Sequence, residues 1–284
     1  MTILVFGKTG QVACELHARS QLTALGRDEA DLRDPEACEA AIVAHAPTAV
    51  INAAAYTAVD KAEEEEALAT QINGVASAAM ARACAKRDIP FVHISTDYVF
   101  DGSGEAAWKA NDKPAPVSAY GRSKLAGEEG VLAAGGRYAI LRTSWVFSSH
   151  GNNFLKSMLK LSEARRELNV VADQIGGPTH AGAIAAACLK IAGELRADPS
   201  RAGTYHFSGM PDTSWAEFAR AIFAEAGRNV AVHSIPTSEY PTVATRPLNS
   251  RLDCGATHAA FGIERPDWRS DLRVAVRQIL SKEY

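Results

Sequence analysis

Short apolar runs alternate with longer stretches of mixed polarity through the first half of the chain. Apolar runs end near residues 6, 25, 53, 95 and 143, and alanine-rich stretches with the composition of helices lie near 11–19, 35–46, 64–87 and 118–133. Strands and helices that alternate at this spacing form βαβ units, in which the strands pair in parallel. The pattern therefore predicts an α/β fold built on a Rossmann-like, doubly wound parallel sheet.

The pattern loosens after residue 145. Proline and glycine become frequent, and the segments typical of regular structure are helices near 151–165, 180–196, 214–227 and 269–282 and a strand near 203–207. We expect residues 1–145 to form a dinucleotide-binding domain whose main sheet is completed by parts of 165–210. We expect residues 146–284 to form mainly a smaller C-terminal substrate lobe that is interleaved with this domain.

A glycine-rich turn follows the first apolar run and opens a predicted helix. Its glycines, Gly7 and Gly10, allow phosphates to approach the backbone, and the first N–H groups of the helix favour an anion. The spacing Gly-x-x-Gly-x-x-Ala differs from the usual Gly-x-Gly-x-x-Gly, and Ala13 in the third place is small enough for close packing of helix on strand. We expect this turn to bind a pyrophosphate, with an ordinary strand–turn–helix as the alternative.

The end of the second predicted strand bears on the choice of cofactor. Gly26 and Arg27 stand where a fold that binds NAD usually has an acidic residue for the ribose hydroxyls. The guanidinium of Arg27 can instead pair with a 2′-phosphate, which favours NADPH over NADH. Asp28 and Glu29 follow directly and weaken the argument, and a solvated arginine is the alternative.

Tyr120 and Lys124 are four residues apart in a predicted helix and therefore share one of its faces. A tyrosine with a pKa of about 10 is a poor acid at neutral pH, and a nearby ammonium group lowers that pKa. The pair would then exchange a proton with a carbonyl or alcohol oxygen, to which Thr96 can offer its hydroxyl. A solvated tyrosine beside a surface lysine is the alternative. His93, inside the apolar run before Thr96, is expected to be a hydrogen-bonded core histidine.

Composition and charge exclude several classes of function. The chain has 284 residues, a net charge of −3 and 22% charged residues, and none of its apolar runs reaches membrane-spanning length. We therefore expect no nucleic-acid partner and no membrane partner. The five cysteines lack metal-ligand spacing and the first apolar run is too short for a signal peptide, so we expect free thiols and a cytoplasmic protein. The acidic run Glu63 to Glu66 is better explained as the first turn of a helix than as a metal site, and we assign no metal ligands.

Segments spread over nearly the whole chain resemble the extended short-chain dehydrogenase/reductase superfamily and, within it, the dTDP-4-dehydrorhamnose reductase family. They are ILVFGKTGQVACEL at the start, VINAAAYTAVDKAE at 50–63, HISTDYVFDG at 93–102, AYGRSKLAGE at 119–128, LRTSWVF at 141–147, GNNF at 151–154, DQIGGPT at 173–179 and TRPLNSRL at 245–252. The resemblance implies an NAD(P)H-dependent oxidoreductase that reduces the 4-keto group of dTDP-4-dehydro-L-rhamnose to dTDP-L-rhamnose, a step of nucleotide-sugar and cell-surface polysaccharide biosynthesis.

The resemblance also implies roles for individual residues. Tyr120 is similar to the catalytic acid of the family, Lys124 to its partner that also holds the nicotinamide ribose, and Thr96 to the hydroxyl that polarises the sugar carbonyl. With the residues discussed above, the expected cofactor-binding residues are Gly7, Gly10, Gln11, Val12, Arg27, Asp31, Leu32, Ala55, Tyr56, Thr57, Tyr120 and Lys124, and the expected substrate-binding residues are Thr96, Asp97, Trp145 and Arg246. Trp145 as a core residue, Asp97 as a turn former and Arg246 as a surface charge are the alternatives.

Three other functions are alternatives to this one, and the first is a 4,6-dehydratase or epimerase of the same superfamily. A 4,6-dehydratase of the superfamily has Asp-Glu directly after the threonine, whereas Thr96 is followed here by Asp97 and Tyr98. A non-catalytic, NADP-binding regulatory subunit, such as that of methionine adenosyltransferase, is disfavoured by the intact Thr96, Tyr120 and Lys124. A reductase of another nucleotide-linked ketosugar stays open because pocket shape decides it. A nucleotide sugar is the expected small-molecule partner, and a homodimer and an interface metal are left open.

Overall fold

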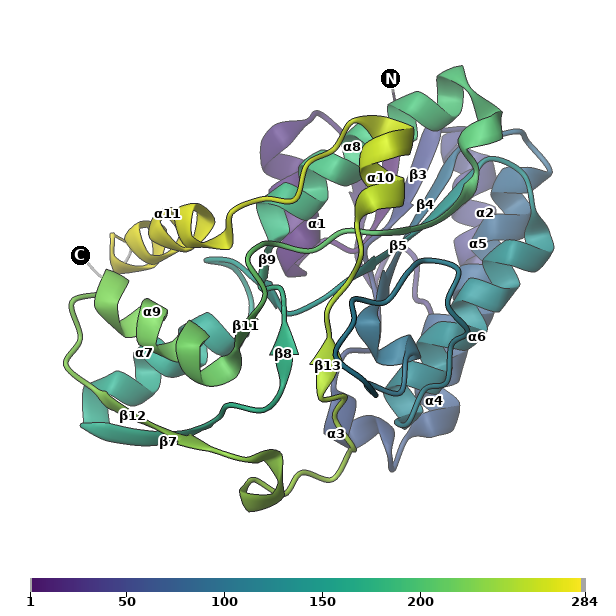
Figure 1. Ribbon diagram of the computed structural model, residues 1–284. Helices are drawn as coiled ribbons and strands as arrows, with labels where there is room; N and C mark the ends of the chain where they lie inside the picture. Colours follow the sequence, from purple (N-terminus) through teal and green to yellow (C-terminus); the bar gives the residue numbers. More distant parts are fainter. Residues whose placement is uncertain (1, 282–284) are drawn as a thin grey trace.

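The computed structural model describes residues 2–281 and confirms the parallel α/β sheet predicted from the sequence (Figure 1). Six strands form the main sheet in the order β10-β5-β4-β3-β1-β2, and each neighbouring pair is parallel. The strands are β1 (Ile3–Phe6), β2 (Thr23–Leu25), β3 (Ala49–Asn52), β4 (Phe91–Thr96), β5 (Tyr138–Thr143) and β10 (Gly203–His206). The predicted strands therefore form where the apolar runs lie, and the strand expected at 203–207 extends the edge of the sheet.

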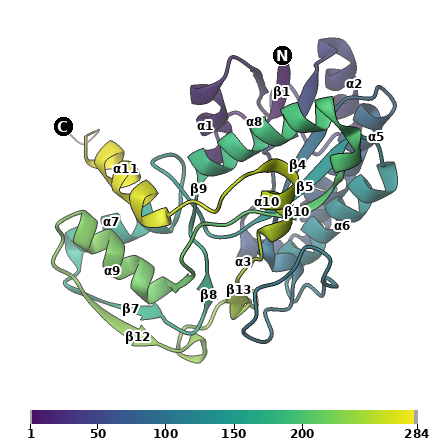
Figure 2. The same cartoon turned by 45° about the horizontal axis from the view of Figure 1, so that its top comes forward.

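Helices cover both faces of this sheet because successive strand residues point to opposite sides. Ile3 and Val5 pack in one hydrophobic cluster with α1 (Gln11–Arg19) and α8 (Ala181–Ala197). Leu4 and Phe6 face the opposite cluster, to which α2 (Pro35–His45), α5 (Ala76–Ala85) and α6 (Ala119–Ala134) contribute. Figure 2 shows α8 lying across the sheet with α10 (Gly255–Phe261) close to β10.

The acidic run Glu63 to Glu66 lies between two short helices rather than at the start of one long helix. The helix expected over 64–87 is divided into α4 (Glu66–Thr70), the π-helical segment η1 (Gln71–Val75) and α5, and it follows α3 (Val59–Ala62). The expectation that all four acids form a first turn is wrong, because α4 begins only at Glu66 and two of the acids have partners on α6. The Glu63 carboxylate accepts a hydrogen bond from the backbone N–H of Ala119 at 2.9 Å, and Glu66 forms an ion pair with Arg122.

A smaller lobe forms from residues after β5, at the left of Figure 1. Its hydrophobic core lies among α7 (Phe154–Ala164), α9 (Trp215–Glu225) and α11 (Trp268–Leu280), with Phe218 and Trp268 fully buried. The pair β7 (Glu167–Val171) and β12 (Ala231–Ile235) covers one side. These strands were not predicted, and β12 is partly or fully exposed along its whole length, so it lacks the apolar run by which the main-sheet strands were recognised.

Short strands and turns connect the lobe to the main sheet. β6 (Val146–Phe147) pairs with β9 (Thr179–His180), and β8 (Ile175–Gly176) lies between β11 (Thr213–Ser214) and β13 (Asn249–Ser250). The 3-10 turns are η2 (Asp97–Val99), η3 (Pro199–Arg201) and η4 (Thr237–Glu239). The chain therefore passes between the two parts several times before α11.

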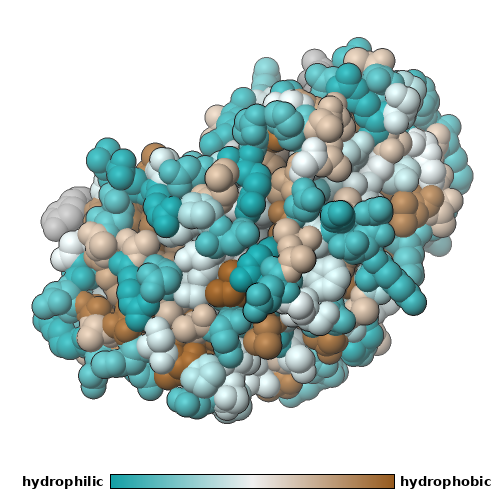
Figure 3. Space-filling view, viewed as in Figure 1, coloured by the Kyte–Doolittle hydropathy of each residue, from teal (hydrophilic) through white to brown (hydrophobic). Residues whose placement is uncertain are grey.

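The surface and the cysteines agree with a globular fold. Cys38, Cys84, Cys188 and Cys254 are buried free thiols, as expected, and Cys14 is half-buried. On the face drawn in Figure 3, hydrophobic side chains are dispersed among hydrophilic ones. In residues 2–281 we find no helix with both the length and the apolarity to cross a bilayer.

Candidate active site

The C-terminal ends of the parallel strands and the adjoining face of the smaller lobe enclose a cleft of about 1450 Å³. Pockets for one drug-sized ligand have volumes of about 300–1000 Å³. This cleft therefore has room for two ligands side by side. All the site residues named from the sequence line it: Gly7, Gly10, Gln11, Val12, Arg27, Asp31, Leu32, Ala55, Tyr56, Thr57, Thr96, Asp97, Tyr120, Lys124, Trp145 and Arg246.

The glycine-rich turn between β1 and α1 forms one end of the cleft. Gly7 has a φ of +111°, in the region that favours glycine, and a Cβ there would lie 3.3 Å from the backbone of Ala53. Helix α1 begins at Gln11, and within residues 2–281 its first turn has no side-chain cap. Open N–H groups at a helix start that a backbone can approach fit a pyrophosphate group. Ala13 is fully buried in α1, so the departure from a third glycine is accommodated.

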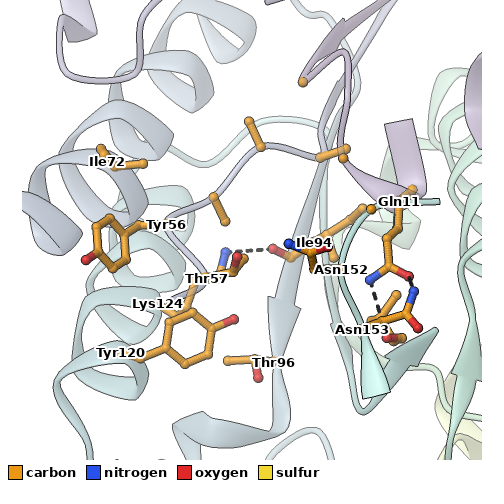
Figure 4. Close-up of a pocket in the computed structure, with 18 of the residues that line it drawn as sticks. Gln11, Tyr56, Thr57, Ile72, Ile94, Thr96, Tyr120, Lys124, Asn152 and Asn153 are labelled. Atoms are coloured by element: carbon orange, nitrogen blue, oxygen red, sulfur yellow. Dashed lines mark hydrogen bonds between the residues drawn. The ribbon is translucent and has the colours of Figure 1, made fainter. Parts of the chain in front are cut away.

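The side chain of Gln11 connects this turn to the smaller lobe. Its Oε1 accepts hydrogen bonds from Ser148 Oγ and Asn153 Nδ2, both at 2.9 Å. Asn153 also caps α7 by accepting a hydrogen bond from the N–H of Lys156 at 3.1 Å. Figure 4 shows Gln11 and Asn153 side by side across the cleft from Tyr56. The start of α7 is thus fixed against the glycine-rich turn through one glutamine.

Charges of both signs surround the end of β2. Arg27 is exposed and lines the cleft. The Glu29 carboxylate accepts a hydrogen bond from the N–H of Gly26 at 2.8 Å and pairs with Lys8 Nζ at 3.1 Å. That backbone hydrogen bond and Lys8 hold the pKa of Glu29 below its usual value. Position 27 is not acidic, but an acid three positions from Gly26 folds back onto this strand end.

The turn after β3 is held by a polar side chain of the π-helical segment. Asn73 accepts a hydrogen bond from the N–H of Tyr56 at 2.8 Å and donates to the carbonyl of Tyr56 at 3.0 Å. It also donates to Ser123 Oγ at 2.9 Å. One π turn thus places Asn73 between the Ala55–Thr57 turn and α6, and π segments of this kind often occur at functional sites.

Tyr120 and Lys124 lie on one face of α6 beside the end of β4. The helix begins there because Ser118 caps it, accepting a hydrogen bond from the N–H of Gly121 at 3.2 Å. Lys124 is buried and its Nζ donates to the carbonyl of Ile94 at 2.7 Å. Figure 4 shows the ring of Tyr120 beside Lys124, with its hydroxyl directed to the side of the cleft where Thr96 lies.

The ionisation of this pair differs from the sequence-based expectation. Burial raises the pKa of Tyr120 well above its usual value, and the Thr96 hydroxyl only partly offsets this. Burial also lowers the pKa of Lys124 to about 8, against a smaller opposing effect of Glu128. The pKa of Tyr120 therefore does not lie below its usual value, as the nearby lysine led us to expect, because the loss of hydration is the largest effect on it.

Thr96 and Asp97 form a buried polar patch at the end of β4. Thr96 Oγ1 donates a hydrogen bond to Asp97 Oδ1 at 3.1 Å and accepts one from the N–H of Tyr98 at 3.2 Å. Burial raises the pKa of Asp97 to about 6, and the hydroxyls of Ser250 and Thr96 oppose the rise. Asp97 Oδ2 and the hydroxyl of Thr143, which is paired with Thr96 in the sheet, are buried without a partner among residues 2–281. Two unsatisfied oxygens that line a cleft suit a ligand with hydroxyl groups.

Aromatic side chains form the wall contributed by the smaller lobe. Trp145 stacks on Trp215 with ring centroids 3.6 Å apart, and Phe154 packs against Trp215 at 4.6 Å. Trp145 has a φ of +48°, which is unusual for a bulky residue and is compatible with a functional constraint. Flat apolar rings at the mouth of a cleft suit a sugar or a base.

Arg246 crosses from the late segment of the chain to the main domain. Its Nη2 pairs with Asp60 Oδ2 at 2.6 Å and its Nη1 donates to the Tyr98 hydroxyl at 3.2 Å. Asp60 Oδ1 also accepts a hydrogen bond from the N–H of Ala244 at 3.1 Å. Arg246 is therefore fixed at the cleft rather than free in solvent.

Several cleft residues were not recognised from the sequence. Asp60 and Asn153 lie inside TAVDKAE and GNNF, so the motifs held a signal for them although no role was assigned. Thr143 likewise lies inside LRTSWVF, at the end of a predicted strand, and was given no role. Trp215 gave no local signal, because the folded chain alone brings α9 to this wall. His93 is a buried, hydrogen-bonded core histidine as expected, but its ring also contacts Lys124.

The chain is similar to known proteins over its whole length. Residues 1–281 match the family model described as RmlD substrate binding domain. A dTDP-4-dehydrorhamnose reductase of Burkholderia thailandensis is 45% identical over 99% of this chain and 100% of the relative. The crystal structure of a dTDP-4-dehydrorhamnose reductase from Clostridium acetobutylicum has a TM-score of 0.92 and 34% identity, over 99% of this chain and 100% of that one. A reductase of the same name from Bacillus anthracis, solved in complex with NADP, has a TM-score of 0.90 and 32% identity, over 98% and 99% of the two chains.

Proposed function

This chain belongs to the RmlD substrate binding domain family, and we propose that it reduces the 4-keto group of dTDP-4-dehydro-L-rhamnose to give dTDP-L-rhamnose, with NADPH as the hydride donor. Relatives that match it over their full length include dTDP-4-dehydrorhamnose reductases, and one of these was solved with NADP. The observation that carries the proposal is the convergence of Tyr120, Lys124 and Thr96 at the end of β4, inside a cleft with room for two ligands.

The residues of the chain fit a bound NADPH, which supplies the hydride. The glycine-rich turn and the open start of α1 would hold its pyrophosphate, and the turn Ala55–Thr57 would lie along it toward the nicotinamide end. We propose further that NADPH is preferred to NADH, since Arg27 can pair with a 2′-phosphate. Glu29 and Asp28 keep the expected preference modest.

Tyr120 is the proposed proton donor. As the carbonyl oxygen of the substrate gains negative charge, hydrogen bonds from the hydroxyls of Tyr120 and Thr96 stabilise it in a site with little water. The proton then passes from the phenol to the sugar oxygen, and the phenolate remains. The raised pKa of Tyr120 keeps it protonated before that step, and the ammonium form of Lys124 stabilises the phenolate after it.

The sugar nucleotide is proposed to occupy the half of the cleft next to the smaller lobe. Asp97 Oδ2 and the Thr143 hydroxyl are available to sugar hydroxyls. Trp145 would pack against an apolar face of the sugar, and Arg246 would meet the diphosphate if the latter competes with Asp60. In this proposal residues 1–145, with β10, hold the dinucleotide, and residues 146–281 supply most of the substrate side.

One assay tests the proposal. The purified protein is incubated with NADPH and dTDP-4-dehydrorhamnose, the consumption of NADPH is followed, and the sugar product is identified by NMR. We expect dTDP-L-rhamnose in an amount equal to the NADPH consumed. Faster turnover of a ketosugar on another nucleotide would reassign the substrate, and NADPH binding without turnover of any ketosugar would favour a regulatory subunit.

A further inference from the structure

The buried side of Lys124 contacts a histidine to which the proposed reaction assigns no role. Nζ of Lys124 lies 3.3 Å from Nε2 of His93, in addition to its hydrogen bond to the carbonyl of Ile94. Lys124 and His93 are 2% and 0% exposed. Water therefore does not compete for this contact, and the hydrogens on the two nitrogens decide whether it is favourable.

Asn52 fixes which nitrogen of His93 carries the proton. Asn52 Oδ1 accepts a hydrogen bond from the N–H of Ala54 at 3.2 Å, which orients the amide. Its Nδ2 then lies 3.2 Å from Ser77 Oγ and 3.2 Å from Nδ1 of His93. An amide NH2 only donates, so Nδ1 must accept, and the neutral ring carries its proton on Nε2.

An Nε2–H group that faces Lys124 discriminates between the two charge states of the lysine. A neutral amine accepts the hydrogen bond, whereas an ammonium group would place a donor against a donor. To accept from the ammonium, His93 would have to move its proton to Nδ1, and Asn52 would have to turn its amide and give up the bond from Ala54. We propose that His93, with its tautomer fixed by Asn52, is a positioning residue that opposes the protonation of Lys124.

The other groups around Lys124 do not override the effect of His93 on its protonation. Glu128, one turn further along α6, favours the ammonium form, but its carboxylate is already bound by Arg142 at 2.6 Å and by Ser95 at 2.6 Å. Burial and Lys124 keep the pKa of His93 well below its usual value, so His93 stays neutral and its tautomer alone decides how it meets Lys124. Tyr120 shares the face of α6 and is itself held neutral by burial. The row of hydrogen-bonded side chains from Lys124 through His93 and Asn52 ends at the buried Ser77, so it provides no path for a proton to solvent.

The tautomer can be measured in the free protein. Long-range 1H–15N NMR distinguishes Nδ1–H from Nε2–H in neutral histidine, and a His93→Gln variant identifies the signals of His93. Above pH 8, where burial leaves Lys124 increasingly uncharged, we expect the Nε2–H tautomer. An Nδ1–H tautomer at that pH would overturn the proposal whatever the activity of the protein.

Replacement of Asn52 tests the consequence. In Asn52→Asp the carboxylate accepts from Nδ1–H, so Nε2 becomes an acceptor for the ammonium of Lys124. We expect the pH at which kcat/KM falls on the alkaline side to rise by about one unit. The pH at which NADPH affinity falls, measured by fluorescence, should rise by the same amount. Ser77→Ala, which removes the other partner of the same amide, should leave both pH values unchanged.

This second test rests on the proposed function, whereas the NMR measurement does not. If the alkaline pH dependence is unchanged in Asn52→Asp, or shifts equally in Ser77→Ala, then Asn52 and His93 only pack in the core and do not affect the protonation of Lys124. If Asn52→Asp does not fold, the wild-type spectrum alone decides. Reductase activity without the expected tautomer would refute only the role of His93, and the expected tautomer without reductase activity would refute only the function.

Discussion

At the scale of single residues, the cleft depends on a tyrosine that burial makes harder to ionise. Burial raises the pKa of Tyr120, so the phenol is fully protonated when a substrate enters. It is therefore a proton donor first, and the cost of its phenolate has to be offset by neighbouring groups. A second tyrosine, the half-buried Tyr98, packs edge-on against it with ring centroids 5.5 Å apart, and this neighbour provides a matched control.

Tyr120→Phe should abolish most of the turnover. The change removes the proton donor and keeps the ring, so we expect kcat to fall by about 10²-fold or more while NADPH affinity changes little. Steady-state kinetics and fluorescence titration measure the two quantities. Tyr98→Phe should retain kcat within a few-fold, and a larger loss in Tyr98→Phe than in Tyr120→Phe would mean that the acid has been assigned to the wrong ring.

Arg27→Asp should reverse the preference for NADPH over NADH. The exposed guanidinium is replaced by a carboxylate that repels a 2′-phosphate and accepts from ribose hydroxyls. The ratio of kcat/KM for the two cofactors measures the effect. Arg228→Asp makes the same charge change at an exposed site in the other lobe and should leave the ratio unaltered. A wild-type preference for NADH would show that Glu29 and Asp28 outweigh Arg27.

At the scale of elements, the start of α7 is tied to the start of α1. Asn153 caps α7 and also donates to Gln11 in the glycine-rich turn. One side chain thus has a local function, which any good capping residue can fulfil, and a long-range one, which needs the reach of an amide. The two functions are separable by substitution.

Asn153→Ala should lose both functions. We expect the free energy of unfolding to fall by about 1–2 kcal/mol from the lost cap, and NADPH binding to weaken several-fold because Gln11 loses a partner. Asn153→Ser keeps a capping oxygen but is too short to reach Gln11, so it should recover most of the stability and little of the affinity. Equal recovery of both in Asn153→Ser, measured by urea unfolding and cofactor titration, would show that the link to Gln11 contributes nothing.

Most elements were predictable because their signals are local. The cap of α2, Asp34 followed by Pro35, forms as its sequence indicates, and the parallel strands coincide with apolar runs. The division of the expected helix 64–87 was not predictable, because Glu63 and Asn73 take partners far away in the sequence. In the site, the residues to which the motifs assigned a role line the cleft, whereas Thr143 lies in a motif without an assigned role and Trp215 joins the cleft through packing alone. The raised pKa of Tyr120 also depends on burial, which no motif records.

At the scale of the whole molecule, the two parts should unfold together. Strand β10 is part of the main sheet and helix α8 packs against it, although both follow the first segments of the smaller lobe in sequence. Neither part is a continuous piece of chain. A ligand held mainly by one part should therefore stabilise the other.

NADPH at about 100 times its dissociation constant should raise the melting temperature as a single transition. The expected stabilisation is about 2.7 kcal/mol, which corresponds to about 5–10 °C for a chain of this size. Calorimetry with and without NADPH measures it, and adenosine 2′,5′-bisphosphate serves as a control that reaches only the adenine end. Two resolved transitions, with only the first moved by NADPH, would contradict this coupling.

The interleaving of the two parts also limits how this protein can be re-engineered. Substrate choice in many enzymes is altered by exchanging one contiguous cassette between homologues, but here the chain leaves the main sheet after β5, re-enters it at β10, and later returns to pack against it with α10. A chimaera with new sugar specificity would need at least three grafted segments, roughly 146–180, 208–248 and 265–281. Each junction would have to preserve the short pairings of β6 with β9 and of β8 with β11 and β13. Point substitution at the cleft wall is therefore a more practical route to a new substrate than recombination.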